Sequence, residues 1–390
     1  MKKIILTFFI LLILSSFFYC IFDKKDNDSN SIINNKNEDV RGIFVSFIEL
    51  SKLKNMDING KKNYIKEMIE VIYDFKLNTI ILQVRPFCDA IYKSNIFYRS
   101  SVVYNDKIDL DILEYFINEA HKKNIKIYAW INPYRVRSNN DLTSISSDDN
   151  ISKFINTNKM EVKNGIYLNP ADSSVLELII NGVKEIVSNY RVDGILYDDY
   201  FYPSNTIDIE NYNKEGNGLT LFEYRINNIN KLIKSTYDAI KSINKDVLFI
   251  ISPQGNIKNN LNNEYLDIEF ILKNNNYIDI VMPQLYYGFL NSTMPFIDTL
   301  NVWNNIILNN DTKLVIALAL YKSGKEDKYA KDGYYEWINN SDIIRNEIKE
   351  SMKVSKYNGF SLFRYDFLVS NDNKCLEEEV KGLRTFLEEY

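Results

Sequence analysis

Short apolar runs alternate with longer amphipathic segments from position 41 to the end of the chain. A short apolar run is typical of a buried strand, and apolar residues every three or four positions are typical of a helix that packs on one face. Because most of the runs are almost wholly apolar, we expect a parallel sheet covered on both faces. Eight strands are expected, at residues 42–47, 79–84, 126–131, 194–198, 247–252, 278–283, 313–320 and 359–363.

Five segments between these runs have the helical spacing, at residues 61–75, 109–123, 173–190, 221–243 and 341–356. Eight strands with intervening helices predict an α/β fold of the TIM (β/α)8 barrel type, which takes about 250 residues. Most of the surplus follows the third, fourth and seventh strands, which predicts long loops at the C-terminal face, where such barrels place their active sites. A doubly wound open sheet is the alternative, but it needs a glycine-rich turn after the first strand and residues 46–50 contain no glycine.

The first 38 residues have a different composition from the rest. Lys2 and Lys3 precede an apolar stretch that ends near residues 20–22, so residues 1–22 are expected to be an export signal or a membrane anchor. Cys20 is a candidate for lipidation, and the alternative is an uncleaved helix, because residues 4–22 are long enough to span a bilayer. Residues 23–38 are polar and are expected to form a disordered tether before a folded domain at 39–390. Both alternatives place the protein at the cell envelope, attached to the membrane.

Composition narrows the chemistry. The chain has 47 basic and 52 acidic residues, a net charge of −5, which argues against nucleic-acid binding through bulk charge. Its single histidine, His121, is expected to be structural, and it leaves too few ligands for a multi-histidine zinc site. We therefore expect no metal and no cofactor. The three cysteines give no disulfide framework, and nothing in the sequence indicates an oligomeric state. With these classes excluded, the composition leaves catalysis by Asp and Glu carboxylates as the open possibility.

Asp198 and Asp199 end the fourth expected strand, in the segment DGILYDDYFYP at residues 193–203. A carboxylate that faces the mouth of a barrel is costly unless it is hydrogen-bonded or used. The structural alternative is that Arg85 or Arg135 binds these groups to shape the loops. The functional interpretation is a glycosidase carboxylate centre, with Asp199 preferred because it stands last before Tyr200.

Other polar and aromatic residues follow the strands and should meet at the same mouth. Arginines can orient carboxylates, and tyrosine and tryptophan offer a flat apolar face with a polar tip, although any one of them is more often a core residue. We expect Arg85 and Arg135 to keep Asp198 and Asp199 ionised. Asp89 and Asp366 are candidates for a general acid because they follow strands. The expected substrate-binding residues are Gln83, Arg85, Trp130, Asn132, Tyr134, Arg135, Tyr200, Gln284 and Tyr286.

Several blocks, in this order, resemble the glycosyl hydrolase-like 10 family of bacterial exported barrel proteins. They cover roughly residues 41–363 and read RGIFVSF, NTIILQVRPFCDAIYKS, EAHKKNIKIYAWINPYR, YLNP, VDGILYDDYFYP, ISPQG and IDIVMPQLYYG. The resemblance implies a TIM barrel, an envelope location and hydrolysis of carbohydrate, with cell-wall (peptidoglycan-type) glycan as substrate. Tyr128 departs from the family, whose members often have histidine there. A weaker likeness links DGILYDD and MPQLYYG to chitinase-like enzymes, and it places that pattern's acid position on Tyr200.

Two functions from different classes follow. The first is a glycoside hydrolase that acts on cell-wall or related polysaccharide through Asp198 and Asp199. The second is a non-catalytic glycan-binding envelope protein that keeps the cleft without a competent acid and base. A metal-dependent deacetylase would need histidine ligands that the chain lacks.

Overall fold

The computed structural model describes residues 39–105, 110–145 and 150–390. The expected export segment with Cys20, and the tether, lie outside the described residues. The chain divides into two units, Met1–Val40 and Arg41–Tyr390. Across the described ranges, no helix combines the length and the apolar character that crossing a membrane requires.

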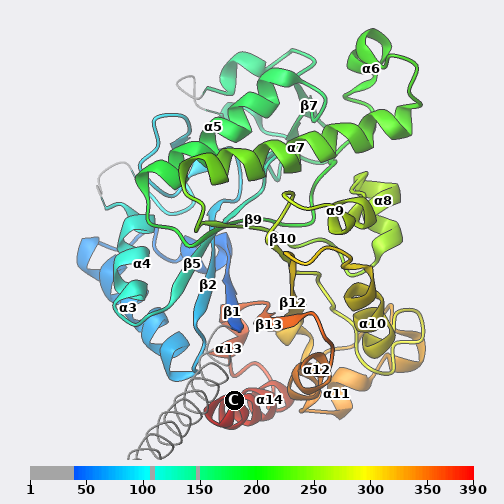
Figure 1. The fold of residues 1–390 in the computed structure, drawn as a ribbon. Coiled ribbons are helices and arrows are strands. Elements are labelled where there is room, and N and C mark those ends of the chain that lie inside the picture. The colour runs from blue at the N-terminus through cyan, green and yellow to red at the C-terminus, as the bar shows by residue number, and fades with distance from the viewer. Residues whose placement is uncertain (1–38, 106–109, 146–149) are drawn as a thin grey trace, which may run out of the picture. The chain divides into compact units, whose positions relative to one another are not determined.

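Eight parallel strands close into a barrel, which confirms the predicted TIM fold and excludes the open sheet (Figure 1). Around the barrel the strands follow the order β1, β13, β12, β11, β10, β9, β5 and β2. Their bounds are β1 Val40–Val45, β2 Thr79–Arg85, β5 Lys126–Ile131, β9 Gly194–Tyr197, β10 Leu248–Ile251, β11 Ile280–Val281, β12 Lys313–Leu318 and β13 Tyr357–Leu362.

Helices surround the strands and cover their outer faces (Figure 1). Each of several helices begins where a side chain accepts a hydrogen bond from a backbone N–H of the first turn, as Asp57, Asp111, Asp172 and Thr220 do. The principal helices are α3 Ile58–Asp74, α4 Ile112–His121, α5 Ser173–Asn189, α7 Leu221–Ile243, α8 Ile257–Glu264, α9 Ile268–Lys273, α10 Phe296–Ile306, α12 Ile343–Ser351 and α14 Lys374–Glu389.

Side chains alternate between the barrel interior and the layer beneath the helices. In β9, Ile195 and Tyr197 belong to the hydrophobic core outside the barrel, whereas Leu196 is buried apart from that cluster. Tyr197 pairs in register with Ile131 of β5 and Ile251 of β10. Residues that directly follow these three strands therefore meet at one level of the mouth.

Loops at this end of the barrel carry the surplus length, as predicted. The loop after β5 forms a small sheet in the order β6, β8, β7 (Arg135–Arg137, Ile166–Leu168, Met160–Val162). A pair of short strands, β3 Asp89–Ala90 and β4 Tyr98–Arg99, follows β2. Shorter helices lie in the remaining loops: α2 Phe47–Ser51, α6 Ile209–Glu215, α11 Glu336–Asn339 and α13 Tyr365–Leu368.

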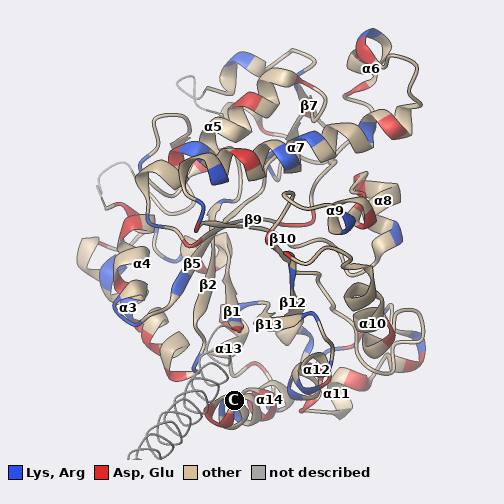
Figure 2. Ribbon diagram, in the orientation of Figure 1, with Lys and Arg blue, Asp and Glu red and all other residues tan. Residues whose placement is uncertain are grey.

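Charged residues of both signs are interspersed along the outer helices, as α7 illustrates in Figure 2. At the other end of the barrel, His121 Nε2 lies 2.9 Å from Asp193 Oδ2, which also accepts a hydrogen bond from the Ile127 N–H at 2.7 Å. His121 therefore ties α4 to the start of β9, in keeping with the structural role expected of it.

Candidate active site

An open groove of about 410 Å³ lies at the mouth of the barrel, within the size range of small-molecule sites. Residues in the last part of β1, β2 and β5, or directly after β1, β5, β9, β11, β12 and β13, line it. They are Phe44, Ser46, Phe47, Ile48, Gln83, Trp130, Arg135, Asp198, Asp199, Tyr200, Gln284, Tyr286, Tyr321, Phe363 and Arg364.

Both predicted carboxylates line this groove. The strand β9 ends at Tyr197, so strand alternation does not separate Asp198 from Asp199. Asp198 is buried, with 5% of its surface exposed, and Asp199 is more open to the groove. Asp199 is therefore the carboxylate that a ligand in the groove reaches more directly.

A chain of side-chain hydrogen bonds holds Asp198 in place. The backbone N–H of Phe47 donates to Gln83 Oε1 at 2.9 Å, and Gln83 Nε2 donates to Asn132 Oδ1 at 2.7 Å. Asn132 Nδ2 in turn donates to Asp198 Oδ2 at 2.5 Å. Gln83 and Asn132 thus fix one carboxylate oxygen, through partners that begin on the loop after β1.

Arg135 lies beside the carboxylates but gives its hydrogen bonds to other groups. Its Nε donates to the Pro86 carbonyl at 2.9 Å, and its Nη2 donates to Asn132 Oδ1 at 3.1 Å. The guanidinium lies over the rings of Phe87 and Tyr200, 5.1 and 5.5 Å from their centroids. Arg135 therefore acts on the carboxylates through its charge and supports the exposed ring of Tyr200.

Burial decides the protonation of the pair. Loss of solvation and, to a smaller extent, the neighbouring charge of Asp199 together raise the pKa of Asp198 to about 7, against the opposing effects of Arg135 and Asn132. Burial also raises the pKa of Asp199, although Gln284 and Arg135 favour its ionised form. The expectation that arginines keep both groups fully ionised is wrong, because desolvation outweighs the single nearby guanidinium. The two carboxyl groups therefore titrate as a coupled pair, and Asp198 loses its proton near neutral pH.

Arg85 does not reach the groove. The pairing of β2 with β5 shifts between Gln83 and Arg85, so that Arg85 pairs with the outward-facing Ile131. Such an irregularity turns the next side chain to the other face of the strand. The Arg85 guanidinium stacks on the Phe97 ring at 3.7 Å and is fully buried. Beneath α5, a Cβ at Gly182 would lie 2.3 Å from its Nη1, so this close contact requires glycine.

Tyr134 also lies elsewhere than expected. Its side chain is 1% exposed and belongs to the hydrophobic core outside the barrel, close to Tyr197. The two proposed general acids do not line the groove either. Asp89 is buried in β3, and Asp366 pairs with Lys52 at 2.8 Å and with Arg364 at 3.4 Å.

The remaining predicted binding residues meet at the site. Asn132 reaches it through its bond to Asp198. The indole of Trp130 also favours the ionised form of Asp198. Gln284 Nε2 donates to the Ser252 carbonyl at 3.0 Å. The others line the groove directly: Gln83, Trp130, Arg135, Tyr200, Gln284 and Tyr286.

Sequence reasoning missed Glu264, at the end of α8. One of its oxygens accepts hydrogen bonds from the backbone N–H groups of Phe201 and Tyr202, at 3.1 and 3.0 Å. Burial raises the pKa of Glu264 to about 7, and the charge of Asp199 adds to the increase. Glu264 thus holds the turn that carries the carboxylates.

A second set missed by the sequence reasoning lies at the end of β1, where Phe44 packs edge-to-face on Trp130 at 5.4 Å. Glu49, fully buried, binds Ser46 and accepts a hydrogen bond from Arg364 Nη1 at 2.6 Å. The other candidates were selected because they are polar or aromatic and follow a strand. Ser46 and Phe47 also follow a strand, but they are uncharged and were not selected.

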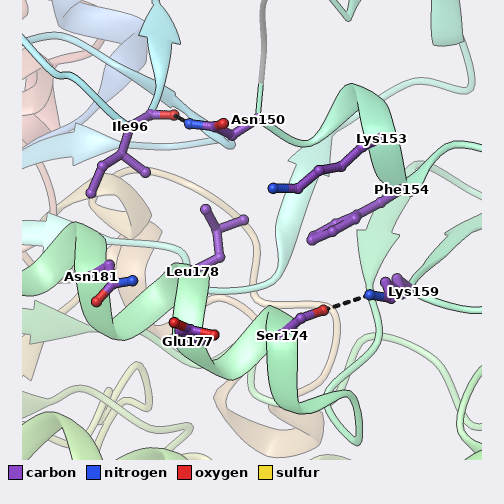
Figure 3. A pocket seen from close by; sticks show the side chains of 9 residues that line it. All are labelled: Ile96, Asn150, Lys153, Phe154, Lys159, Ser174, Glu177, Leu178 and Asn181. Atoms are coloured by element: carbon purple, nitrogen blue, oxygen red, sulfur yellow. Dashed lines mark hydrogen bonds between the residues drawn. The ribbon is translucent and has the colours of Figure 1, made fainter.

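A larger hollow, of about 520 Å³, lies between α5 and the loop at residues 150–159 (Figure 3). Lys159 Nζ donates to Ser174 Oγ at 2.8 Å on its wall, and Phe154 and Leu178 face the same space. Glu177 is the one carboxylate among its lining residues, so this hollow lacks the paired carboxylates of the groove. Over the ranges that the structure describes, no group of three or more His, Cys, Asp and Glu side chains is placed to hold a metal ion.

Comparison with known proteins links this geometry to one group. The model of the family described as glycosyl hydrolase-like 10 matches residues 39–335. The glycosyl hydrolase DigH of Escherichia coli is 29% identical over 324 residues, which cover 75% of this chain and 73% of DigH. The glycosyl hydrolase YngK of Bacillus subtilis is 27% identical over 303 residues, which cover 70% of this chain and 59% of YngK.

Solved structures share the fold at low sequence identity. The glycoside hydrolase domain of PgaB (BpsB) from Bordetella bronchiseptica has a TM-score of 0.56 and 11% identity, and covers 89% of this chain and 98% of its own. A GH113 β-1,4-mannanase has a TM-score of 0.53 and 11% identity, and covers 90% of this chain and all of its own. At such identities, the likeness establishes the barrel architecture alone.

Proposed function

The chain belongs to the glycosyl hydrolase-like 10 family, and from that premise we propose that it hydrolyses glycosidic bonds of cell-wall (peptidoglycan-type) or related polysaccharide. The observation that carries the proposal is the pair Asp198 and Asp199 at the end of β9, on the wall of an open groove. Two carboxyl groups of unlike protonation are what glycoside hydrolysis requires.

Asp199 is the proposed catalytic residue. In its ionised form, it faces the groove and stabilises the positive charge that develops on the sugar ring in the transition state. Below about pH 7, Asp198 carries the proton of the pair. Asn132 donates to Asp198 Oδ2, which leaves Oδ1 as the oxygen that can carry this proton. Asp198 thereby keeps a second negative charge out of the same desolvated site.

The other groove residues are proposed to bind the sugar. Trp130, Tyr200 and Tyr286 present aromatic rings, and Gln284 presents an amide to the hydroxyl groups. Three further residues act indirectly. Gln83 and Asn132 hold Asp198 in place, and Arg135 supports the Tyr200 ring.

Incubation of the purified full-length protein with purified cell-wall glycan, followed by mass analysis of the products, tests the proposal. Release of shorter glycan fragments supports it. Binding of the glycan without any cleavage would instead assign the chain to the non-catalytic glycan-binding class.

We expect kcat/KM to fall as the pH rises above about 7. The pKa of Asp198 is raised to about 7, so in this range the pair loses its shared proton and two negative charges come to lie side by side. A group that must be protonated gives about a tenfold decline for each pH unit above its apparent pKa. A pH profile of kcat/KM from pH 5 to 9 measures this limb.

Two variants assign the limb to a residue. Asp198→Asn cannot lose a proton, so its remaining activity should show no decline near pH 7. Glu264→Gln should keep the decline, although the pKa of Glu264 is also raised to about 7. If the decline above pH 7 persists in Asp198→Asn and is absent in Glu264→Gln, the group whose proton controls the activity is Glu264 and not Asp198.

We also propose that the protein is exported and tethered to the membrane through a lipid on Cys20 or through the apolar segment itself. The support is the basic start and the apolar run of residues 1–22. Cell fractionation should find the full-length protein with membranes. If Cys20→Ser releases it, the anchor is a lipid, and if the variant stays bound, the anchor is the helix. A cytoplasmic, soluble full-length protein would contradict the proposal.

A further inference from the structure

A second hollow, of about 440 Å³, adjoins the groove, because Tyr286 lines both. Its other walls include Tyr287 after β11, Asn256 and Asn259 around the start of α8, and Tyr329 in the loop after β12. The strands β10, β11 and β12 are successive neighbours in the barrel, and β9 with its carboxylates follows directly on β10. The hollow therefore lies next to the groove around the mouth of the barrel.

A third hollow, of about 470 Å³, continues the second. The two share Asn256, Thr293 and Met294, and the third extends to Trp303 on α10. Figure 1 shows α8 and α10 on this same side of the barrel. Each of the three spaces is within the size range of a small-molecule site. Shared lining residues join them in one row that starts at Asp199.

The walls of this row are built before any ligand binds. The Asn291 side chain accepts hydrogen bonds from the Thr293 and Met294 N–H groups, both at 3.0 Å. Thr293 Oγ1 donates to the Tyr329 carbonyl at 3.2 Å, which joins the loops after β11 and β12. Lys322 Nζ donates to the Tyr286 carbonyl at 2.7 Å. A preformed wall lowers the entropy cost of binding.

Gly255 allows the close packing beneath Tyr287. A Cβ at position 255 would lie 2.6 Å from the Tyr287 ring and 2.6 Å from the Gln284 carbonyl oxygen. Trp303 Nε1 fixes the same turn by donating to the Gly255 carbonyl at 2.8 Å. A larger residue at position 255 would push the Tyr287 ring out of the wall.

The chemistry of the second hollow suits a hydroxyl-rich and uncharged ligand. Tyr329 leaves 88% of its surface exposed, so its ring offers a flat apolar face with a polar tip to a ligand. Asn256 and Asn259 add amide groups that both donate and accept hydrogen bonds. The two charges in the wall, Lys322 and Asp327, pair with each other at 2.6 Å.

We propose that these hollows and the groove form one track that binds a glycan chain over several successive sugar units, on one side of the bond at Asp199. The inference rests on the proposed function and names the form of the substrate, which is an extended chain whose unit in the second hollow is uncharged. Tyr329 and Tyr287 are the binding residues of the second hollow.

Tyr329→Ala tests the track in the full-length protein, with Tyr335→Ala as the matched control. Tyr335 is another exposed tyrosine of the same region, and it does not line the hollow. The probe is cell-wall glycan fractionated by chain length. Removing one stacking ring should raise KM for long chains about two- to tenfold with little change in kcat. The ratio of KM for long chains to KM for the shortest cleaved fragments should rise, and Tyr335→Ala should match the parent.

The inference is overturned if the parent treats long and short chains alike, or if Tyr329→Ala changes both KM values by the same factor or neither. If the parent cleaves no glycan, the proposed hydrolase function fails. The track is then tested by calorimetry, which measures the affinity of the protein for the same series of glycan lengths. Affinity that increases with chain length and weakens in Tyr329→Ala then supports it. Affinity independent of length, or no binding at all, overturns it.

Discussion

Asp199→Asn is expected to lower kcat about a hundredfold or more on a glycan that the parent cleaves, without lowering the melting temperature. The substitution keeps the size of the side chain and removes the charge that stabilises the transition state. Burial raises the pKa of Asp199, so the fold favours the neutral form, and its ionisation costs stability as the pH rises above the ordinary carboxyl pKa. At neutral pH, the neutral amide should therefore leave the melting temperature unchanged or raise it. Kinetics and thermal unfolding at pH 7 measure both effects.

Asp198→Asn is the matched comparison, because the two carboxylates are adjacent and both line the groove. Asp198 is more deeply buried, and an amide at position 198 can still accept the hydrogen bond from Asn132 through its oxygen. We expect Asp198→Asn to lose less turnover than Asp199→Asn. Near-parent turnover in Asp199→Asn would remove Asp199 from the mechanism and leave Asp198 as the remaining candidate on that strand.

Elements with a regular pattern of apolar residues were predictable from the sequence. The expected strand 126–131 and the expected helix 221–243 coincide with β5 and α7. The sixth strand is shorter than predicted, because β11 ends at Val281, two residues before Pro283, which has no N–H to donate to a ladder. Apolar residues continue past the end of a strand wherever the core does, so composition alone does not mark that end.

The side of the barrel that a residue faces was harder to predict. Alternation from Gln83 places Arg85 on the same face, and the register shift between β2 and β5 reverses this. No glycine or proline marks the irregularity within β2. Tyr134 has the composition of a sugar-binding residue, but it packs against the core beside Tyr197. Local sequence carries neither fact, because both depend on the partner strand and on the helices outside it.

Contacts between segments that are far apart in the sequence could not be predicted from it. Glu264 stands more than sixty residues after Asp199, at the end of a short polar helix, yet it binds the turn after β9. The balance between burial and Arg135 at Asp198 likewise needs the depth of the site, which only the folded barrel defines. Residue type and position after a strand were thus enough to locate the mouth of the barrel. The protonation of Asp198 and Asp199 depends on how the loops pack around them, which the sequence does not show.

Arg225→Met is expected to lower the free energy of unfolding by about 3–5 kcal/mol, the cost of leaving a buried charge without its partner. Arg225 Nε and Nη2 donate to the two oxygens of Asp208 at 2.7 and 2.9 Å, and Asp208 is fully buried. Tyr202 donates its hydroxyl to Asp208 at 2.6 Å, and Arg225 Nη1 donates to the Tyr265 hydroxyl at 2.7 Å. The pair therefore joins α7 to the loop that follows β9 and to the end of α8.

Lys234→Met, on the same helix, is the matched control, because Lys234 pairs with Asp238 on the surface, where such pairs contribute less than about 1 kcal/mol. Denaturant unfolding of the three proteins should separate the two substitutions clearly. Adding Asp208→Asn to Arg225→Met removes the stranded charge, so the double variant should regain part of the lost stability. If Arg225→Met unfolds within about 1 kcal/mol of the parent, the hydrogen bond from Tyr202 suffices for Asp208, and the guanidinium is not what holds this loop.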